Sequence, residues 1–418
     1  MRQRLADIVF CSVLIAFAVS CTVPGAIRHG SVTIDDYTKF DCDTIKRGDS
    51  VFRFAGKGRA LLDTLQIDYR LWHRDTVLHM SIDKDFEMFP DVRKAVLVIR
   101  NDSILYENYS NGMDRYTIST IFSVSKTITG LMCGIALKDG FIKSLDDAVT
   151  DYIPELKDCD PMFSSLKISH LLDMTAGFDF EENYGMNPFS RMARLYLGTD
   201  ALREIRKAKF KSVPGENYHY DSMTTAVLGV VIERAVGMTY ARYLSEKVWK
   251  PLGMEQDALV SLDSRKSGIA KAYGGIATNA RDLAKIGRLY LNYGNWDGRQ
   301  IVDSSFVARS LSTNIAGTGA KGLYSYSWYW GFVEPKELSD VESMTEYYAG
   351  RDDVEFTGNW YYNDGEYQAI LHKGGFWGFG LYGQVLYVNP RKNMIGVYLG
   401  SDRTEDYQRI FDRISDSL

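Results

Sequence analysis

Strand-like patterns lie on both sides of a long segment with helical periodicity. Residues 95–99 and 104–109 are short apolar runs separated by a turn, which predicts a β-hairpin. Residues 149–260 are predicted to be mostly helical, and strand patterns return from Tyr324 onward. We therefore predict an α+β fold in which an antiparallel sheet, built from both chain ends, is flanked by helices and carries an inserted, mainly helical lobe.

Individual elements can be predicted within this order. A 3.6-residue apolar period runs through residues 226–235 and ends at Gly237, and a second one stops at Pro251. Three further strands and two further helices are predicted, the strands at 368–371, 384–388 and 394–399 and the helices at 281–293 and 407–414.

The motif Ser123-Val124-Ser125-Lys126 precedes an apolar run at residues 128–136. If that run is a helix, Ser123 and Lys126 lie one turn apart on one face, near an N-terminus whose free N–H groups favour negative charge. Such an arrangement can make a serine nucleophilic without a histidine. In isolation, Ser123 could equally be an ordinary helix N-cap beside a solvated lysine.

A second S-x-x-K pattern begins at Ser164 and ends at Lys167. It follows a loop at Pro161 and leads into a short segment that ends at Gly177. We predict no catalytic role for this copy, which shows that the pattern alone is weak.

The N-terminus is typical of an export signal. Residues 1–20 combine two arginines with an apolar stretch that is too short for a comfortable membrane span, so we predict a signal peptide there. The segment ending in Cys21 resembles the lipobox of bacterial lipoproteins, which predicts lipidation of Cys21 and membrane attachment facing the periplasm or the cell surface. A plain secretory signal is the alternative. Residues 22–90 are predicted to form an N-terminal extension.

Composition excludes several classes of function. The formal net charge is −5 and no stripe of Lys and Arg interleaves with aromatic residues, so no nucleic-acid partner is predicted. The six histidines show no H-x-x-x-H or H-x-H spacing, and no G-x-S-x-G turn occurs. We expect no metal and no organic cofactor, and a small-molecule or short-peptide substrate.

Seven motifs in register resemble the serine β-lactamase-related hydrolases, which include class C β-lactamases, D-alanyl-D-alanine carboxypeptidases and esterases. The resemblance covers residues from about 90 to 400 and is strongest to the 6-aminohexanoate-dimer hydrolase branch. It implies a β-lactamase-like domain over residues 91–418. The motifs are 122–127 (FSVSKT), 151–156 (DYIPEL), 171–177 (LLDMTAG), 220–222 (YDS), 249–254 (WKPLGM), 281–284 (RDLA) and 380–384 (GLYGQ).

The resemblance implies roles for individual residues. Ser123 matches the family's nucleophile and Lys126 its proton acceptor, while Tyr220 matches the tyrosine that moves protons between serine, lysine and leaving group. Whether the lysine or a tyrosinate is the base stays open. Ser222 stands where β-lactamases have asparagine, which puts β-lactamase activity in doubt but leaves a substrate-binding role.

The family's K-T-G strand has two candidate matches. His372-Lys373-Gly374 fits by residue type, whereas Gly378-Phe379-Gly380 fits by its distance from the following motifs. We favour the second match. It implies that the N–H groups of Ser123 and Leu381 form the oxyanion hole and that Gly380 lines the substrate site. For His372, substrate contact and an ordinary strand position are both open.

The sequence thus predicts an exported serine hydrolase that cleaves an ester or amide through an acyl-enzyme on Ser123. One alternative is a D-alanyl peptidase or weak β-lactamase, and another is a catalytically weak penicillin-binding or sensor protein. Asp179, Glu181 and Glu182 could recognise a substrate amine, but a solvated acidic loop suits them better. Substrate choice is expected to depend on loops around 179–194 and 326–350.

Overall fold

The computed structural model describes residues 30–56, 66–70, 77–183, 187, 189–312, 324–336, 341–349, 354–363, 366–402 and 407–418. The predicted signal peptide, residues 1–20, and Cys21 lie outside this set. In the part of the chain that is described, no helix combines the length and the apolar character needed to cross a bilayer.

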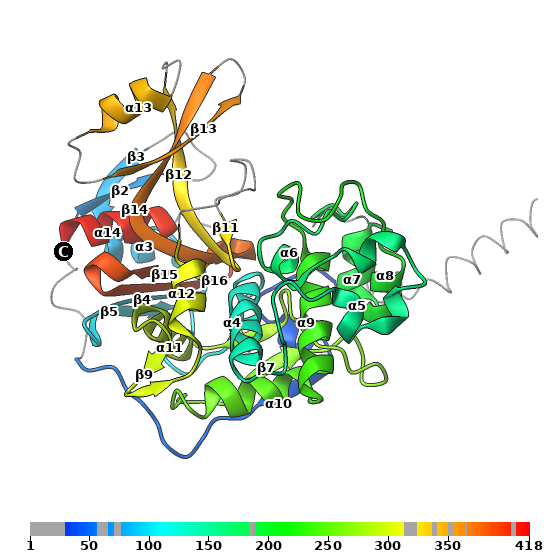
Figure 1. Ribbon diagram of the computed structural model, residues 1–418. Coiled ribbons are helices and arrows are strands. Elements are labelled where there is room, and N and C mark those ends of the chain that lie inside the picture. The colour runs from blue at the N-terminus through cyan, green and yellow to red at the C-terminus, as the bar shows by residue number, and fades with distance from the viewer. Residues whose placement is uncertain are drawn as a thin grey trace, which may run out of the picture.

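An eight-stranded antiparallel sheet forms the left part of the molecule in Figure 1. It unites strands from both ends of the folded chain, as the sequence predicted, and this confirms the α+β fold. In spatial order the strands are β11 (Tyr324–Ser325), β12 (Trp328–Lys336), β14 (Glu366–Gly380), β15 (Gln384–Asn389), β16 (Met394–Gly400), β4 (Lys94–Arg100) and β5 (Ser103–Ser110), while β13 (Glu355–Asn363) pairs with β14.

The pairing of β16 with β4 joins the two chain ends. Seven residue pairs run in continuous register from Met394 opposite Arg100 to Gly400 opposite Lys94. Six of the seven residues of β4 are buried, because helices cover both faces of the sheet. The predicted hairpin at 95–109 is therefore formed by β4, which lies inside the sheet, and β5, which forms its edge.

Helices α4 (Val124–Lys138) and α11 (Ala280–Leu291) cover one face, together with α12 (Ser304–Ser310). A Cβ atom at Gly287 of α11 would lie 2.9 Å from the Ile395 side chain, so this helix packs very close to β16. The predicted amphipathic helix at 281–293 is thus confirmed, and its apolar side faces the sheet.

The opposite face is covered by α14 (Tyr407–Ser417) and α3 (Ile82–Met88). The rings of Tyr398 and Tyr407 stack at 3.9 Å between centroids, and Gly396 leaves room for the Phe411 ring. This packing confirms the predicted C-terminal helix and its role as a cover for the sheet.

The inserted lobe lies on the right in Figure 1 and is mainly helical. Its longest helix, α9 (Ser222–Val236), ends at Gly237 in the left-handed conformation at φ 64°, as the sequence predicted. The other members are α5 (Val149–Tyr152), α6 (Ile168–Leu172), α7 (Arg191–Leu197), α8 (Ala201–Arg206) and α10 (Tyr240–Leu244), with a π turn over Ser245–Trp249 and 3-10 turns over Pro154–Leu156 and Pro161–Ser164.

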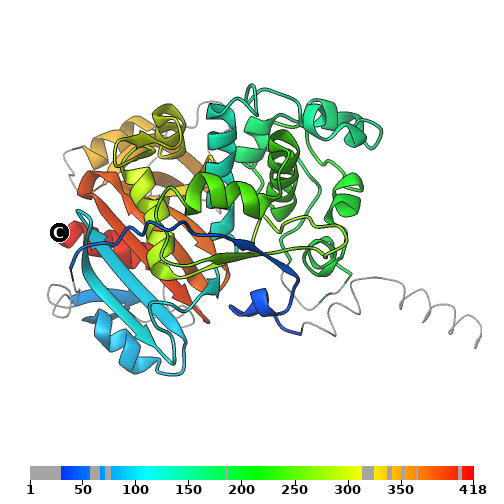
Figure 2. The same cartoon turned by 90° about the horizontal axis from the view of Figure 1, so that it is seen from below.

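The N-terminal segment is integrated into the fold. Strand β1 (Cys42–Ile45) pairs with β7 (Ala258–Ser261) in a small sheet that continues through β8 (Ile276–Thr278) to β6 (Ser119–Thr120), and Figure 2 shows this segment running along the underside. A hairpin of β2 (Gln66–Arg70) and β3 (Val77–Ser81) follows before α3. The predicted boundary at residue 90 stays a prediction.

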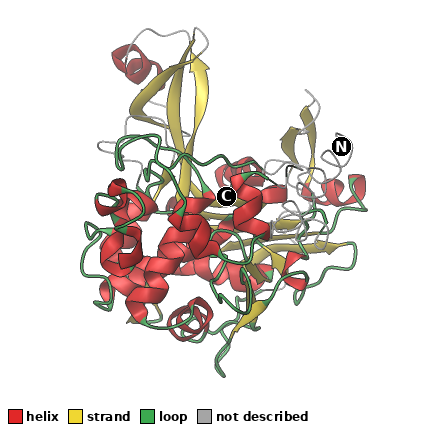
Figure 3. Cartoon of the chain, turned by 90° about the vertical axis from the view of Figure 1, so that its right-hand side faces the viewer, coloured by secondary structure: helices red, strands yellow, loops and turns green. Residues whose placement is uncertain are grey.

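Three long strands carry an outward extension. Parts of β12, β13 and β14 rise above the body together with α13 (Val341–Tyr348), as Figure 3 shows. The region 326–350, expected to contain substrate-defining loops, is therefore partly regular structure. A short pair, β9 (Asn295–Trp296) and β10 (Arg299–Gln300), and 3-10 turns over Asp36–Thr38, Leu381–Gly383 and Pro390–Lys392 complete the elements of the described residues.

Candidate active site

Ser123 is the residue immediately before helix α4. Within residues 119–136 it is the one side chain that is not buried. The preceding Phe122 has a φ of 44°, which is costly for an aromatic residue and is typical of functional turns. This tight turn leads from β6 into α4 and leaves Ser123 partly exposed at the N-terminus of the helix.

Lys126 lies one helical turn further on and is 1% exposed. Its amine lies 2.9 Å from Ser123 Oγ, 3.1 Å from Ser222 Oγ and 2.9 Å from the carbonyl oxygen of Tyr273. Burial lowers the pKa of this lysine to about 8, although the negative charges of Glu182 and Asp221 oppose the shift. A lysine with this pKa is partly neutral near pH 7 and can accept a proton.

Tyr220 lies beside the same amine, with Lys126 Nζ 4.9 Å from the centre of its ring. Desolvation raises the pKa of the Tyr220 phenol well above its usual value, and the charge of Glu182 raises it further. Hydrogen bonds with the side chains of Ser123 and Tyr329 act in the opposite direction. The structure thus places the predicted Ser123, Lys126 and Tyr220 around one point.

Ser222 begins helix α9, and Asp221 caps that helix. The Asp221 carboxylate accepts hydrogen bonds from the backbone N–H of Thr224 at 2.6 Å and from its hydroxyl at 2.9 Å. This cap fixes the first turn of α9 and therefore the position of the Ser222 hydroxyl beside Lys126. Burial raises the pKa of Asp221 to about 7.

The end of β14 approaches the backbone of Ser123. A Cβ atom at Gly380 would lie 2.6 Å from the carbonyl oxygen of Ile121 and 3.2 Å from the amide nitrogen of Ser123. A Cβ atom at Gly378 would lie 2.6 Å from Thr127 Oγ1. These contacts favour Gly378-Phe379-Gly380 as the strand beside the nucleophile, and the oxyanion role of the next residue, Leu381, stays a prediction that they support.

His372 lies eight residues before Gly380 on the same strand, which corresponds to about 25 Å at the usual rise per residue. Its ring contacts Trp330 and Phe376, and its Nε2 lies 3.2 Å from the carbonyl oxygen of Gly375. The structure therefore does not bring His372 to Ser123, because seven residues of β14 separate it from Gly380 and its ring lies in the core of the sheet.

Glu182 differs from the solvated residue that the sequence suggested. Both of its carboxylate oxygens are buried and have no hydrogen-bond partner among the described residues, and its charge acts on Lys126 and Tyr220. Its neighbour Glu181 is exposed, and the Asp179 side chain is 60% exposed. Only these two fit the predicted solvated loop.

A family model described as beta-lactamase matches residues 92–417. The chain belongs to the beta-lactamase family. The family resemblance read from the seven motifs is thereby confirmed, and the protein is a serine hydrolase of that family.

Two curated relatives illustrate the range of the family. The 6-aminohexanoate-dimer hydrolase of Paenarthrobacter ureafaciens is 27% identical over 318 residues, which cover 73% of this chain and 72% of that protein. Esterase EstB of Burkholderia gladioli is 28% identical over 196 residues, 43% of this chain and 50% of that protein. The match to EstB therefore spans half the length of that relative.

Solved structures share the fold. A Bacillus anthracis protein assigned as a 6-aminohexanoate-dimer hydrolase superposes with a TM-score of 0.71 at 22% identity, covering 92% of this chain and 93% of its own. EstCE1, a hydrolase with promiscuous acyltransferase activity, superposes with a TM-score of 0.57 at 18% identity, covering 79% and 95%. Both likenesses show the fold of the family.

Two contributors to the family site were not predicted from sequence. The Tyr273 carbonyl binds Lys126, and Tyr329 hydrogen-bonds to Tyr220 within a cluster that includes Tyr218 and Tyr324. A backbone carbonyl carries no sequence signal. Tyr329 lies in an aromatic run that predicts a strand but does not show which ring faces the site.

The second S-x-x-K copy lies elsewhere in the family fold. Ser164 is exposed in a 3-10 turn, and Lys167 pairs with Asp146 at 2.9 Å on the surface. In the described ranges, no group of three or more His, Cys, Asp and Glu side chains is arranged to hold a metal ion.

Proposed function

We propose that this protein cleaves an ester or amide bond of a small molecule or short peptide through a covalent acyl-enzyme on Ser123. The observation that carries the proposal is the 2.9 Å contact between Ser123 Oγ and the buried Lys126 amine, whose pKa is lowered to about 8. A neutral lysine in that position is a base within hydrogen-bond reach of the nucleophile.

In acylation, Ser123 Oγ attacks the carbonyl carbon while its proton passes to the neutral amine of Lys126. The carbonyl oxygen gains negative charge, which the N–H groups of Ser123 and Leu381 are proposed to stabilise. Collapse of the tetrahedral intermediate breaks the ester or amide bond, and the leaving alcohol or amine takes a proton through Tyr220. Water then attacks the acyl-enzyme by the reverse proton transfers and releases the acid.

The two pKa directions favour lysine over tyrosinate as the base. The pKa of Lys126 falls toward neutrality, whereas the pKa of Tyr220 rises away from it. Tyr220 is therefore a neutral phenol in the resting enzyme, able to donate one proton while it accepts another. We assign it the role of a relay between Lys126 and the leaving group.

Ser222 supports a broad ester or amide substrate over a β-lactam. Its hydroxyl contacts Lys126 at 3.1 Å, but it has no amide that could also reach the acylamino group of a β-lactam. The relatives include an esterase and a 6-aminohexanoate-dimer hydrolase, which supports the same substrate range.

Intact-mass spectrometry tests the proposal with a fluorophosphonate probe and, separately, with a penicillin. Wild type is expected to gain the mass of the probe, and Ser123→Ala is expected to gain none. Absence of a Ser123-dependent adduct with either reagent would contradict the nucleophile assignment. A stable penicillin adduct without turnover of esters or peptides would instead favour a sensor.

We further propose that the chain is exported and lipidated on Cys21, on the basis of its N-terminal sequence. The supporting features are the basic start, the apolar stretch and the segment preceding Cys21. Labelling with a fatty-acid analogue during expression in a Gram-negative host is expected to mark wild type and not Cys21→Ser. A secreted but unlabelled wild-type protein would contradict the lipid anchor and leave export standing.

A further inference from the structure

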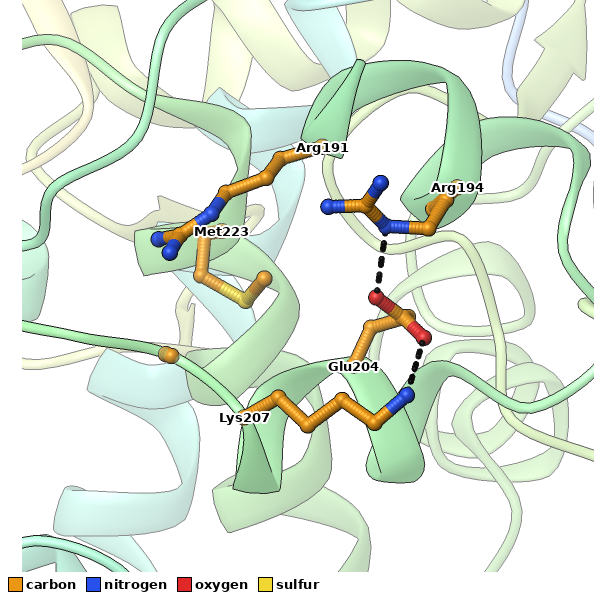
Figure 4. Close-up of a pocket in the computed structure, with 6 residues that line it drawn as sticks. Arg191, Arg194, Glu204, Lys207 and Met223 are labelled. Atoms are coloured by element: carbon orange, nitrogen blue, oxygen red, sulfur yellow. Dashed lines mark hydrogen bonds and ion pairs between the residues drawn. The ribbon is translucent and has the colours of Figure 1, made fainter. Parts of the chain in front are cut away.

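A recess of about 400 Å³ opens between α7, α8 and the first turn of α9, and Figure 4 shows it. Its lining is strongly charged, with three basic side chains and one carboxylate, so that two positive charges are in excess. The lining residues are Arg191, Arg194, Glu204, Lys207, Ala208 and Met223.

The residues that line the recess are linked to the active site by two connections. Met223 of the lining directly follows Ser222, whose hydroxyl contacts the amine of Lys126. The hydroxyl of Tyr273 donates a hydrogen bond to the carbonyl oxygen of Leu195 in α7, while the carbonyl of Tyr273 binds Lys126. Helix α7, which carries both arginines, is thereby tied to the residue that holds the lysine.

Two of the three cations share the one carboxylate of the lining. The Glu204 carboxylate lies between them, with Arg194 Nε at 3.2 Å and Lys207 Nζ at 3.4 Å, as the dashed lines in Figure 4 mark. Arg194 also donates to the carbonyl oxygen of Phe189 at 2.5 Å. Both side chains are therefore held by Glu204 and share its negative charge.

Arg191 is different. Its guanidinium donates one hydrogen bond, to the carbonyl oxygen of Asp179 at 2.5 Å, and the Asp179 carboxylate is 4.0 Å away and mostly exposed. No other acceptor for its remaining N–H groups is found among the described residues. The side chain is 35% exposed, so a small ligand can reach its charge.

We infer that Arg191 forms a subsite for a carboxylate on the substrate, so that the enzyme prefers acidic esters or amides over neutral ones. A guanidinium with free N–H groups matches the two oxygens of a carboxylate. The nearly buried Met223 and Ala208 offer apolar surface to the short chain that links the carboxylate to the scissile carbonyl. Arg191 is thus a specificity residue and takes no part in bond cleavage. The inference rests on the proposed hydrolase function.

Matched substrate pairs test this subsite. The nitrophenyl half-esters of glutarate and adipate are compared with nitrophenyl valerate and hexanoate, which have the same chain lengths and no charge. A second pair, 4-acetoxybenzoate and its methyl ester, places the carboxylate on the leaving group instead. Wild type is expected to favour the acidic member of at least one series by about tenfold or more in kcat/KM, as a charge-assisted hydrogen bond allows.

Arg191→Gln is expected to reduce this preference to within about twofold while leaving hydrolysis of the neutral esters close to wild type. Arg191→Lys should retain part of it, because the charge remains but the planar fork is lost. The matched control is Arg206→Gln, which removes the same charge from an exposed side chain of α8 that is outside the recess lining. It should keep the full preference.

The ratio between paired substrates separates this inference from simple damage, because a distorted loop would lower both rates together. Wild type that hydrolyses neutral esters with no acidic preference in either series would overturn the carboxylate subsite alone. A preference for acidic esters that persists in Arg191→Gln would also overturn the carboxylate subsite and leave the proposed function standing. Wild type that neither hydrolyses any ester nor reacts with the fluorophosphonate would overturn the proposed function itself.

Discussion

The backbone carbonyl of Tyr273 binds the amine of Lys126 at 2.9 Å, and this contact comes from outside the S-x-x-K motif. Tyr273 is itself fixed by the hydrogen bond from its hydroxyl to Leu195. The direction of the lysine side chain is therefore set by the loop between β7 and β8 and by the helical lobe, as well as by α4. The protonation state of Lys126 is therefore the first property to test.

Ester hydrolysis is expected to rise with pH through an apparent pKa of about 8. Burial lowers the pKa of Lys126 from its ordinary value of 10.5 to about 8, and only the neutral amine accepts the serine proton. The value of kcat/KM should therefore increase about tenfold per pH unit well below pH 8 and level off above it. A pH–rate profile between pH 5.5 and 9.5 measures this directly.

Lys271 provides the control for this assignment. It is also fully buried with a pKa lowered to about 7, but its amine lies 3.3 Å from the centre of the Phe40 ring and donates to the carbonyl of Leu262. Lys271→Met should leave the acid limb near pH 8. Loss of the acid limb in this variant would show that Lys271, and not Lys126, is the group that titrates.

Glu182→Gln is expected to shift the acid limb of that profile to lower pH. The negative charge of Glu182 raises the pKa of Lys126, so its removal should lower that pKa by a few tenths of a unit to about one unit. The pH–rate profile of the variant measures the shift. Glu181→Gln, one residue away on an exposed side chain, should give the wild-type profile, and an equal shift in both variants would argue against a direct effect.

Gly380→Ala is expected to lower acylation by about 100-fold or more, because the added methyl group would displace β14 from the backbone of Ser123. Its Cβ would lie 2.6 Å from the Ile121 carbonyl oxygen, whereas a Cβ at Gly274 would meet Phe122 at 3.7 Å, an ordinary contact. Gly274→Ala is therefore the control and should retain near-wild-type rates. Stopped-flow acylation by a nitrophenyl ester, with circular dichroism as a check of folding, distinguishes the two.

Elements whose signal is local could be predicted from the sequence. The hairpin at 95–109, helix α9 with its Gly237 end, and the strands at 384–399 follow from periodicity and turn residues, and the structure confirms them. The nucleophile motif could be placed at a helix start for the same reason. These features depend on neighbours within a few residues along the chain.

Other features depend on residues that are distant in sequence. Glu182 belongs to a polar, acidic stretch that is typical of a solvated loop. The fold nevertheless buries its carboxylate, and its charge acts on Lys126. His372 shares a strand with Gly380, but only the observed length of β14 shows how far apart the two residues lie. The pairing of β1 with β7 joins segments separated by more than 200 residues, and no local pattern could predict it.

Tyr220→Phe is expected to lower ester turnover by about 10²- to 10⁴-fold, the usual range for loss of a positioned acid–base group. The apparent pKa of the acid limb should stay near 8, because Lys126 and not Tyr220 titrates there. Tyr329→Phe removes a hydrogen-bond partner of Tyr220 while the Tyr220 phenol remains, so its rate should fall much less. Wild-type turnover in Tyr220→Phe would contradict the proton relay.

Ser222→Asn is expected to increase acylation by a penicillin by about tenfold, equivalent to one added hydrogen bond. The asparagine carbonyl oxygen can accept from Lys126, as the Ser222 hydroxyl does at 3.1 Å, while its NH₂ group can reach the acylamino carbonyl of the antibiotic. Ester turnover should change by only a few-fold, because that reaction needs only the first of these contacts. Time-resolved intact mass measures the adduct, and Ser222→Ala, which offers neither contact, should gain nothing. Equal penicillin acylation in Ser222→Asn and wild type, with ester turnover preserved, would show that this position does not limit the reaction with β-lactams.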